Sequence, residues 1–190
     1  MASEMQAEYR IRPITAREYH LMGEHGILRE DERIELLDGE LIAMPPIGPD
    51  HAFSVRELTE MFVRRFAGRA IVDVQNPLAL DEYSEPEPDV MLLAMRPDRY
   101  RKGIPEPRDV LLVIEVSNTT WRYDRGRKLR AYARTGIAEL WIVHLAGNCV
   151  FQFREPSGES YARERSFGRG ESLAPAAFPD DAIEVDALLP

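Results

Sequence analysis

Two carboxylates stand out because their positions suit the binding of a divalent metal. Asp89 follows Pro88 directly and leads into a short apolar run, and Glu115 lies near the end of the most hydrophobic run of the chain, 110–116. An ionised carboxylate on a buried strand is costly unless a metal or another cation compensates it. Two carboxylates from neighbouring strands can hold Mg²⁺ and leave positions open for water and phosphate oxygens.

A cation near these carboxylates would complete a site for phosphodiester cleavage. Lys128 lies on the helix expected to follow Glu115, and an ammonium group there could stabilise the charge of the transition state. A bound Mg²⁺ (or Mn²⁺) would polarise the phosphoryl group and lower the pKa of a bound water. Asp89, Glu115 and Lys128 therefore predict a metal-dependent phosphodiesterase.

Further carboxylates come from a predicted β-hairpin near the N-terminus. The pair Asp38-Gly39 separates two apolar runs, and this is a strong hairpin signal because both turn positions need positive φ. A two-residue turn places Glu35 and Glu40 on the same face of the hairpin. One hairpin carboxylate is usually solvated, so at least one of the two is expected to be structural.

The elements that must position these residues follow an α/β (α+β) pattern. Helices are predicted over 15–24, where Thr15 to Glu18 form a capping box, over 50–67 and over 123–134. Strands are predicted over 70–74, 77–80, 90–93, 110–116 and 139–143, with an antiparallel extension at 150–153 and 161–166 and a last short element near 183–189. The strand, helix and strand between 110 and 143 imply a right-handed parallel crossover. The prediction is a mixed β-sheet core flanked by helices on both sides.

The composition fits one domain without covalent staples. The chain has 190 residues, 44% of them hydrophobic, and no stretch approaches the roughly 20 apolar residues that cross a bilayer. The segment Met1 to Arg12 is polar with both charge signs, unlike a signal or transit peptide. The single cysteine, Cys149, excludes an internal disulfide and a cysteine-based zinc site. The expected location is the cytoplasm.

The net charge of −9 argues against a broad nucleic-acid platform. Proteins that hold DNA through many phosphate contacts usually present a basic face. A carboxylate cluster that binds metal would contribute to the surplus without explaining all of it. The charge weakens the case for tight DNA binding and does not exclude cleavage.

The order of the motifs carries a resemblance to a known family. Pro88-Asp89 followed by Glu115-Val116-Ser117 resembles the PD-(D/E)xK nuclease motif, with Ser117 in place of the usual lysine. Several branches of that superfamily carry the lysine on the next helix, and Lys128 looks like such a relocation. With these motifs, further stretches in order resemble the Uma-two family of restriction-endonuclease-like proteins: 35–41, 44–51, 128–132, Gly136 and 139–143.

The resemblance covers about residues 15–165 and implies a restriction-endonuclease-like core within a single domain, 1–190. It implies a metal-dependent endonuclease acting on DNA, with Asp89, Glu115 and Lys128 in the site. An acidic residue of the hairpin, Glu35 or Glu40, would complete it, and Glu40 is counted with Asp89 and Glu115 among the metal ligands. Many nucleases of the superfamily act as dimers because cutting two strands needs two sites, so a homodimer is compatible with this interpretation.

Simpler interpretations of the site residues remain open. Asp89 could be a turn or capping residue, and Glu115 could pair with Arg122 or Arg125. Asp124 and Lys128 stand at i, i+4, the spacing of an ordinary surface ion pair that contributes a few tenths of a kcal/mol.

Other polar and aromatic residues are expected to be structural. His51, at the start of a helix, is more often a cap or hydrogen-bond anchor, although a role near phosphate stays open. Ser117 lacks the His and Asp partners of a nucleophile. Trp141 and Tyr132 are expected in the core, and Cys149 as a small buried apolar group.

Two other functions compete with the endonuclease. One is a non-catalytic module that uses the same fold to bind nucleic acid or a partner protein, as the acidic charge suggests. The other is a phosphodiesterase for small nucleotides or for branched DNA. Fold alone does not separate these functions.

Overall fold

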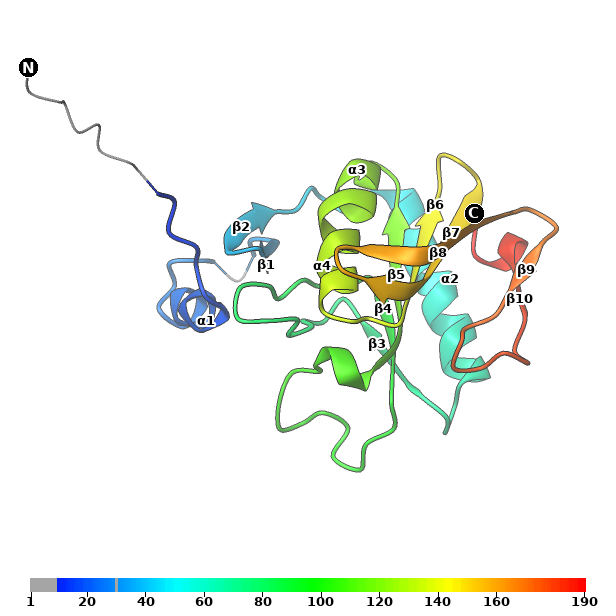
Figure 1. The fold of residues 1–190 in the computed structure, drawn as a ribbon, viewed down its shortest axis with the longest axis horizontal. Coiled ribbons are helices and arrows are strands. Elements are labelled where there is room, and N and C mark those ends of the chain that lie inside the picture. Colours follow the sequence, from blue (N-terminus) through cyan, green and yellow to red (C-terminus); the bar gives the residue numbers. More distant parts are fainter. Residues whose placement is uncertain (1–9, 30) are drawn as a thin grey trace, which may run out of the picture.

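A computed structural model describes residues 10–29 and 31–190, and its centre is a mixed sheet with helices on both faces (Figure 1). Most of the polar segment Met1 to Arg12 lies outside the described residues. The sheet has the order β3-β4-β5-β6-β7-β8. Its strands are β3 (Ile71–Val74), β4 (Val90–Leu93), β5 (Val110–Ser117), β6 (Glu139–His144), β7 (Cys149–Ser157) and β8 (Ser160–Gly168). The expected mixed sheet is confirmed.

The strand directions follow the predicted connections. β5 and β6 pair in parallel, and the helical segment 121–134 joins them. The other neighbours in this sheet are antiparallel. Short turns join β6 to β7 and β7 to β8, whereas the longer segments 75–89 and 94–109 join β3 to β4 and β4 to β5.

The two faces of the sheet form two separate cores because side chains alternate along each strand. On β4, Val90 and Leu92 pack in a cluster with Leu58 and Phe62 of α2 (Pro49–Arg65). Met91 and Leu93 pack in the other cluster, with residues of the segment 121–134. Figure 1 shows α2 and this segment on opposite sides of the strands.

The segment 121–134 is helical throughout but not uniformly α-helical. It consists of α3 (Trp121–Tyr123), a π-helical turn η2 (Asp124–Lys128) and α4 (Leu129–Arg134). In the π turn the amide of Leu129 donates to the carbonyl of Asp124, five residues earlier. A single π turn inside a helix is rare and frequently lies at a functional site.

The predicted hairpin and first helix are present at the N-terminal end. α1 (Ala16–Glu24) begins with the capping box of Thr15 and Glu18. The hairpin pairs β1 (Ile34–Leu37) with β2 (Glu40–Ala43), and both turn residues have positive φ, 53° and 76°. The hairpin lies beside the segment 121–134 in Figure 1.

Some elements differ from the sequence prediction. Residues 77–80 form no strand, because their amides donate to the loop carbonyls of Pro86, Pro105 and Ser84 instead of to a neighbouring strand. The loop 97–109 contains the short 3₁₀ turn η1 (Pro107–Asp109). Near the C-terminus, β9 (Ser172–Leu173) pairs with β10 (Ile183–Glu184), and the 3₁₀ turn η3 (Val185–Ala187) follows. None of the helices in the described part of the chain is long and apolar enough to cross a membrane.

Candidate active site

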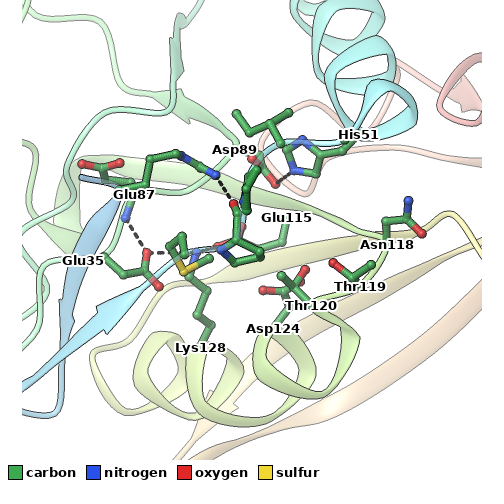
Figure 2. A pocket seen from close by; sticks show the side chains of 16 residues that line it. Glu35, His51, Glu87, Asp89, Glu115, Asn118, Thr119, Thr120, Asp124 and Lys128 are labelled. Atoms are coloured by element: carbon green, nitrogen blue, oxygen red, sulfur yellow. Dashed lines mark hydrogen bonds and ion pairs between the residues drawn. The ribbon is translucent and has the colours of Figure 1, made fainter. Parts of the chain in front are cut away.

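A cavity of about 140 Å³ lies where the sheet, the hairpin and the segment 121–134 meet (Figure 2). Its charged lining residues come from separate parts of the chain: Arg33, Glu35, His51, Glu87, Asp89, Glu115, Asp124 and Lys128. The loop after β5 adds Asn118, Thr119 and Thr120.

The pairing of β4 with β5 places Asp89 next to Glu115. Val90 pairs with Ile114 in antiparallel register, so the next positions, Asp89 and Glu115, lie opposite each other. Asp89 is two residues before Met91 and Glu115 two residues after Val113, and both of these residues belong to the core beneath the segment 121–134. The two carboxylates therefore share the face of the sheet that this helical segment covers.

Three donors hold the carboxylate of Asp89. Its Oδ2 accepts from the backbone amide of Val116 at 2.8 Å and from His51 Nε2 at 3.0 Å, and its Oδ1 accepts from Gln75 Nε2 at 3.2 Å. Burial alone would raise the pKa of Asp89, but the hydrogen bond and charge of His51, with the charge of Lys128, lower it overall. Asp89 is therefore an ionised and fixed carboxylate.

Glu115 is fully buried and short of compensating charge. Its Oε1 accepts from the Tyr132 hydroxyl at 2.6 Å and lies 3.0 Å from Lys128 Nζ. Burial raises the pKa of Glu115 to about 8, against the lowering effect of Lys128 and with a further rise from Asp89. This carboxylate would gain from a second cation.

Lys128 reaches into the cavity from the end of the π turn. Its Nζ lies 3.0 Å from Glu115 and 3.3 Å from Glu35, and its side chain is only 2% exposed. Burial would lower the pKa of Lys128, but the surrounding carboxylates raise it well above the ordinary value. The amine therefore stays protonated.

The hairpin contributes Glu35 to the cavity and not Glu40. The carboxylate of Glu35 is buried and accepts from the hydroxyl of Tyr123 at 2.6 Å and from the amide of Glu87 at 3.1 Å. Glu40 shares the hairpin face but sits at the turn, where its 56% exposed side chain pairs with Arg127 at 2.6 Å. The structure therefore does not bring Glu40 to Asp89 and Glu115, in contrast to the expected ligand set.

Comparison with known proteins agrees with the geometry of the cavity. A family model named Uma2 and described as a putative restriction endonuclease matches residues 16–186. The chain belongs to the Uma2 family. No curated protein matches the sequence.

A solved structure confirms the fold. The crystal structure of a putative nuclease from Anabaena variabilis aligns with a TM-score of 0.73, over 93% of this chain and 97% of that chain. The sequence identity is 15%, so this likeness shows the fold alone. Membership of Uma2 and the fold together indicate a restriction-endonuclease-like nuclease, and hence a hydrolase.

The Uma2 site has more carboxylates than cations. Five carboxylate side chains line the cavity, against Arg33 and Lys128. Burial raises the pKa of Glu87, helped by Glu35, and burial also raises the pKa of Asp124 against the effect of Lys128. Within residues 10–29 and 31–190, no three His, Cys, Asp or Glu side chains form a group that could hold a metal by themselves. Any metal here would need water or substrate oxygens as further ligands.

The simpler interpretations of the site residues can be compared with this Uma2 structure. Arg122 is exposed and Arg125 pairs with Glu164 at 2.7 Å, so Lys128 and not an arginine compensates Glu115. Asp124 is no surface partner of Lys128, because it is buried and accepts from the Thr120 hydroxyl at 2.6 Å.

Several expected structural residues have an additional contact in the Uma2 site. His51 anchors Asp89 by a hydrogen bond, and Tyr132 is fully buried in the core but also donates to Glu115. Trp141 is a core residue as expected, whereas Cys149 is only partly buried.

The sequence analysis did not predict two hydrogen-bond donors of the site, Tyr132 to Glu115 and Gln75 to Asp89. The role of Tyr132 could have been anticipated, because it stands at i+4 from Lys128 and shares its helix face. Gln75 follows β3 with a φ of 50°, and no sequence pattern marks its contact with Asp89.

Proposed function

We propose that this protein is a metal-dependent endonuclease that hydrolyses phosphodiester bonds of DNA. The observation that carries the proposal is the convergence of Asp89, Glu115 and Lys128 in one cavity, from β4, β5 and the π turn between α3 and α4. These residue types are those that the nuclease motif requires. Family membership supports the reaction class.

Asp89 and Glu115 would hold the metal, Mg²⁺ or Mn²⁺. Mg²⁺ keeps several waters and is commonly bound by one or two carboxylates plus substrate phosphate, so two protein ligands are sufficient. The excess of carboxylates in the cavity and the raised pKa of Glu115 fit the addition of a cation. When bound, the ion would supply Lewis acidity and lower the pKa of a coordinated water.

Other residues of the cavity would position the metal ligand and stabilise negative charge. His51, Gln75 and the amide of Val116 fix both oxygens of Asp89, so that this ligand needs no reorganisation. Lys128 stays protonated, which makes it a donor toward developing negative charge and excludes it as a proton acceptor in this state. Glu35 also contacts Lys128, at 3.3 Å, and takes a positioning role.

We also propose an oligomeric state and a cellular location for the enzyme. Cleavage of both strands of a duplex needs two sites, so we include a homodimer that contributes one site from each copy. The proposed location is the cytoplasm.

The decisive experiment is cleavage of supercoiled and single-stranded DNA with Mg²⁺ or Mn²⁺. The wild type should cut, and Glu115→Gln should lose metal-dependent cutting because it removes a metal ligand and keeps the side-chain shape. Glu40→Gln is the matched control, a glutamate of the hairpin outside the cavity, and should cut like the wild type. Equal cutting by the wild type and Glu115→Gln would refute the assignment.

A non-catalytic module that binds nucleic acid or a partner protein is the second candidate. The observation that favours it is the position of Lys128, whose ammonium pairs with both Glu115 and Glu35. Calorimetry separates the two functions. Tight Mg²⁺ or Mn²⁺ binding that is lost in Glu115→Gln supports the nuclease, and the absence of any metal binding supports the module.

A further inference from the structure

A pair of stacked rings lies beside the cavity. Trp121 directly follows Thr120, which lines the cavity, and its ring stacks on that of His144 with 4.0 Å between centroids and 20° between planes. Phe151 extends the group, with its centroid 5.1 Å from that of Trp121. All three side chains are only partly buried. Trp121 and Phe151 pack against the core beneath the segment 121–134, and His144 is paired with Ser117, two residues after Glu115. The pair is thus a partly exposed aromatic group next to the site.

The ring pair is held rigidly. Arg125 lies over the rings of Trp121 and Phe151, with Cζ at 5.3 and 4.9 Å from their centroids. Burial and the charge of Arg125 lower the pKa of His144, so its ring is neutral at neutral pH. The backbone of the turn after β6 also approaches His144 closely, since a side chain at Gly147 would place its Cβ 2.3 Å from Nδ1. A surface fixed in this way loses little conformational freedom on binding.

The charge next to the ring pair is positive and available. Arg122 is exposed and has no ion pair or hydrogen bond with the described residues. Three other arginines of the segment 121–134 are engaged: Arg125 with Glu164, Arg127 with Glu40 and Arg134 with Asp38. Arg130 is exposed like Arg122, but it is nine residues from Trp121. In a chain with a net charge of −9, a free arginine beside an aromatic surface suits a phosphate next to a base.

We propose that the Trp121–His144 pair binds an unpaired base of the DNA strand whose phosphate enters the cavity, with Arg122 at a neighbouring phosphate. This inference rests on the proposed function and adds the substrate class, which is single-stranded or locally opened DNA. Stacking on an aromatic side chain contributes about 1–3 kcal/mol per base and tolerates any sequence, because every base has a π face. Bases inside a duplex are already stacked and do not offer that face.

The two tryptophans of the chain provide a direct assay. Trp141 is fully buried in the sheet, so a quencher that arrives from solution reaches Trp121. The protein in EDTA, where metal-dependent hydrolysis cannot proceed, is titrated with a single-stranded oligonucleotide and with the corresponding duplex. The single strand should quench the emission, and the duplex should quench it less at the same concentration.

Variants test whether the ring is the cause of the preference. Trp121→Leu should weaken binding of the single strand by about 5- to 150-fold, the equivalent of one lost stack, measured by anisotropy of a labelled oligonucleotide. Trp121→Phe should keep part of the affinity. Phe178→Leu is the matched control, another partly buried ring with an arginine at 5.0 Å but in the core on the α2 side, and should bind like the wild type.

The outcomes separate this inference from the proposed function. A folded Trp121→Leu variant with wild-type affinity, or equal quenching by single strand and duplex, overturns the ring site even if the wild type cuts DNA. Binding of the single strand at Trp121 without cleavage in Mg²⁺ or Mn²⁺ supports the ring site and refutes the nuclease. If Trp121→Leu fails to fold, the wild-type titration decides, since absence of quenching overturns the inference.

Discussion

The two glutamates of the hairpin provide a matched test of how the site is held together. Glu35 and Glu40 lie on the same hairpin face, but Glu35 is buried against Lys128 at 3.3 Å and Glu40 is exposed beside Arg127. Removing one partner of a buried ion pair costs about 3–5 kcal/mol because a charge is left uncompensated. Lys128 still lies near Glu115, Asp124 and Asp89, so we expect the lower end of this range, about 3 kcal/mol, for Glu35→Ala. An exposed pair contributes about 0–1 kcal/mol, which is the expectation for Glu40→Ala.

Urea denaturation of both variants at neutral pH measures these values as changes in the free energy of unfolding. Glu35→Gln refines the result, since it can still accept from the Tyr123 hydroxyl and the Glu87 amide and lacks only the charge beside Lys128. It should fall between the wild type and Glu35→Ala. Equal destabilisation by Glu35→Ala and Glu40→Ala would show that Lys128 does not depend on Glu35, and the description of the cluster would be refuted.

Four further predictions concern Glu115, Lys128 and the hairpin turn. The pKa of Glu115 is about 8, and a metal binds the ionised carboxylate. The Mg²⁺ affinity measured by calorimetry should therefore rise about tenfold per pH unit up to pH 8 and then level off. An affinity that does not change with pH would contradict this. Because that pKa lies above the ordinary value, the Glu115 carboxyl stabilises the metal-free fold at acid pH, and this contribution is lost as the pH rises towards 8. The free energy of unfolding, measured at several pH values, should show this loss. Lys128→Met should lower the single-turnover cleavage rate at least about 100-fold at saturating metal, and wild-type rates would remove the lysine from the mechanism. Gly39→Ala should lower the free energy of unfolding by about 1–3 kcal/mol. The new Cβ would lie 2.3 Å from the Cβ of Pro13, and the backbone φ of 76° disfavours a side chain. Gly26→Ala is the control, because Gly26 also has a positive φ but open space around it, and it should cost less.

The sequence was sufficient where one local pattern determines the structure. The apolar runs of β4 and β5 are short, continuous and bounded, so their strand character and the approach of Asp89 to Glu115 could be predicted. The Asp38-Gly39 turn likewise determines the hairpin register. In these cases the periodicity of side chains leaves one arrangement with a buried face.

Long-range contacts decided the remaining features. Residues 77–80 have the composition of a strand, but their amides find carbonyl acceptors in loops, and no neighbouring strand is available to them. The choice between Glu35 and Glu40 could not be made from the hairpin, because the register puts both on one face. It depends on where the hairpin meets the segment 121–134, through Tyr123 for Glu35 and through Arg127 for Glu40.

Lys128, outside the usual motif position, reaches the cavity from the end of a π turn. Asp124 and Lys128 are four residues apart, a spacing that in an exposed α-helix gives an ordinary ion pair. Here the amide of Leu129 donates to the carbonyl of Asp124, five residues earlier. Both the Asp124 and the Lys128 side chains are buried and line the cavity. Ser117 occupies the strand position where the motif usually has lysine, and it is fully buried. The Lys128 ammonium comes instead from the helical segment that covers this face of the sheet, and it lies 3.0 Å from Glu115. We propose that Lys128 takes the place of the motif lysine, so that Ser117→Lys would place two ammonium groups beside the same carboxylate.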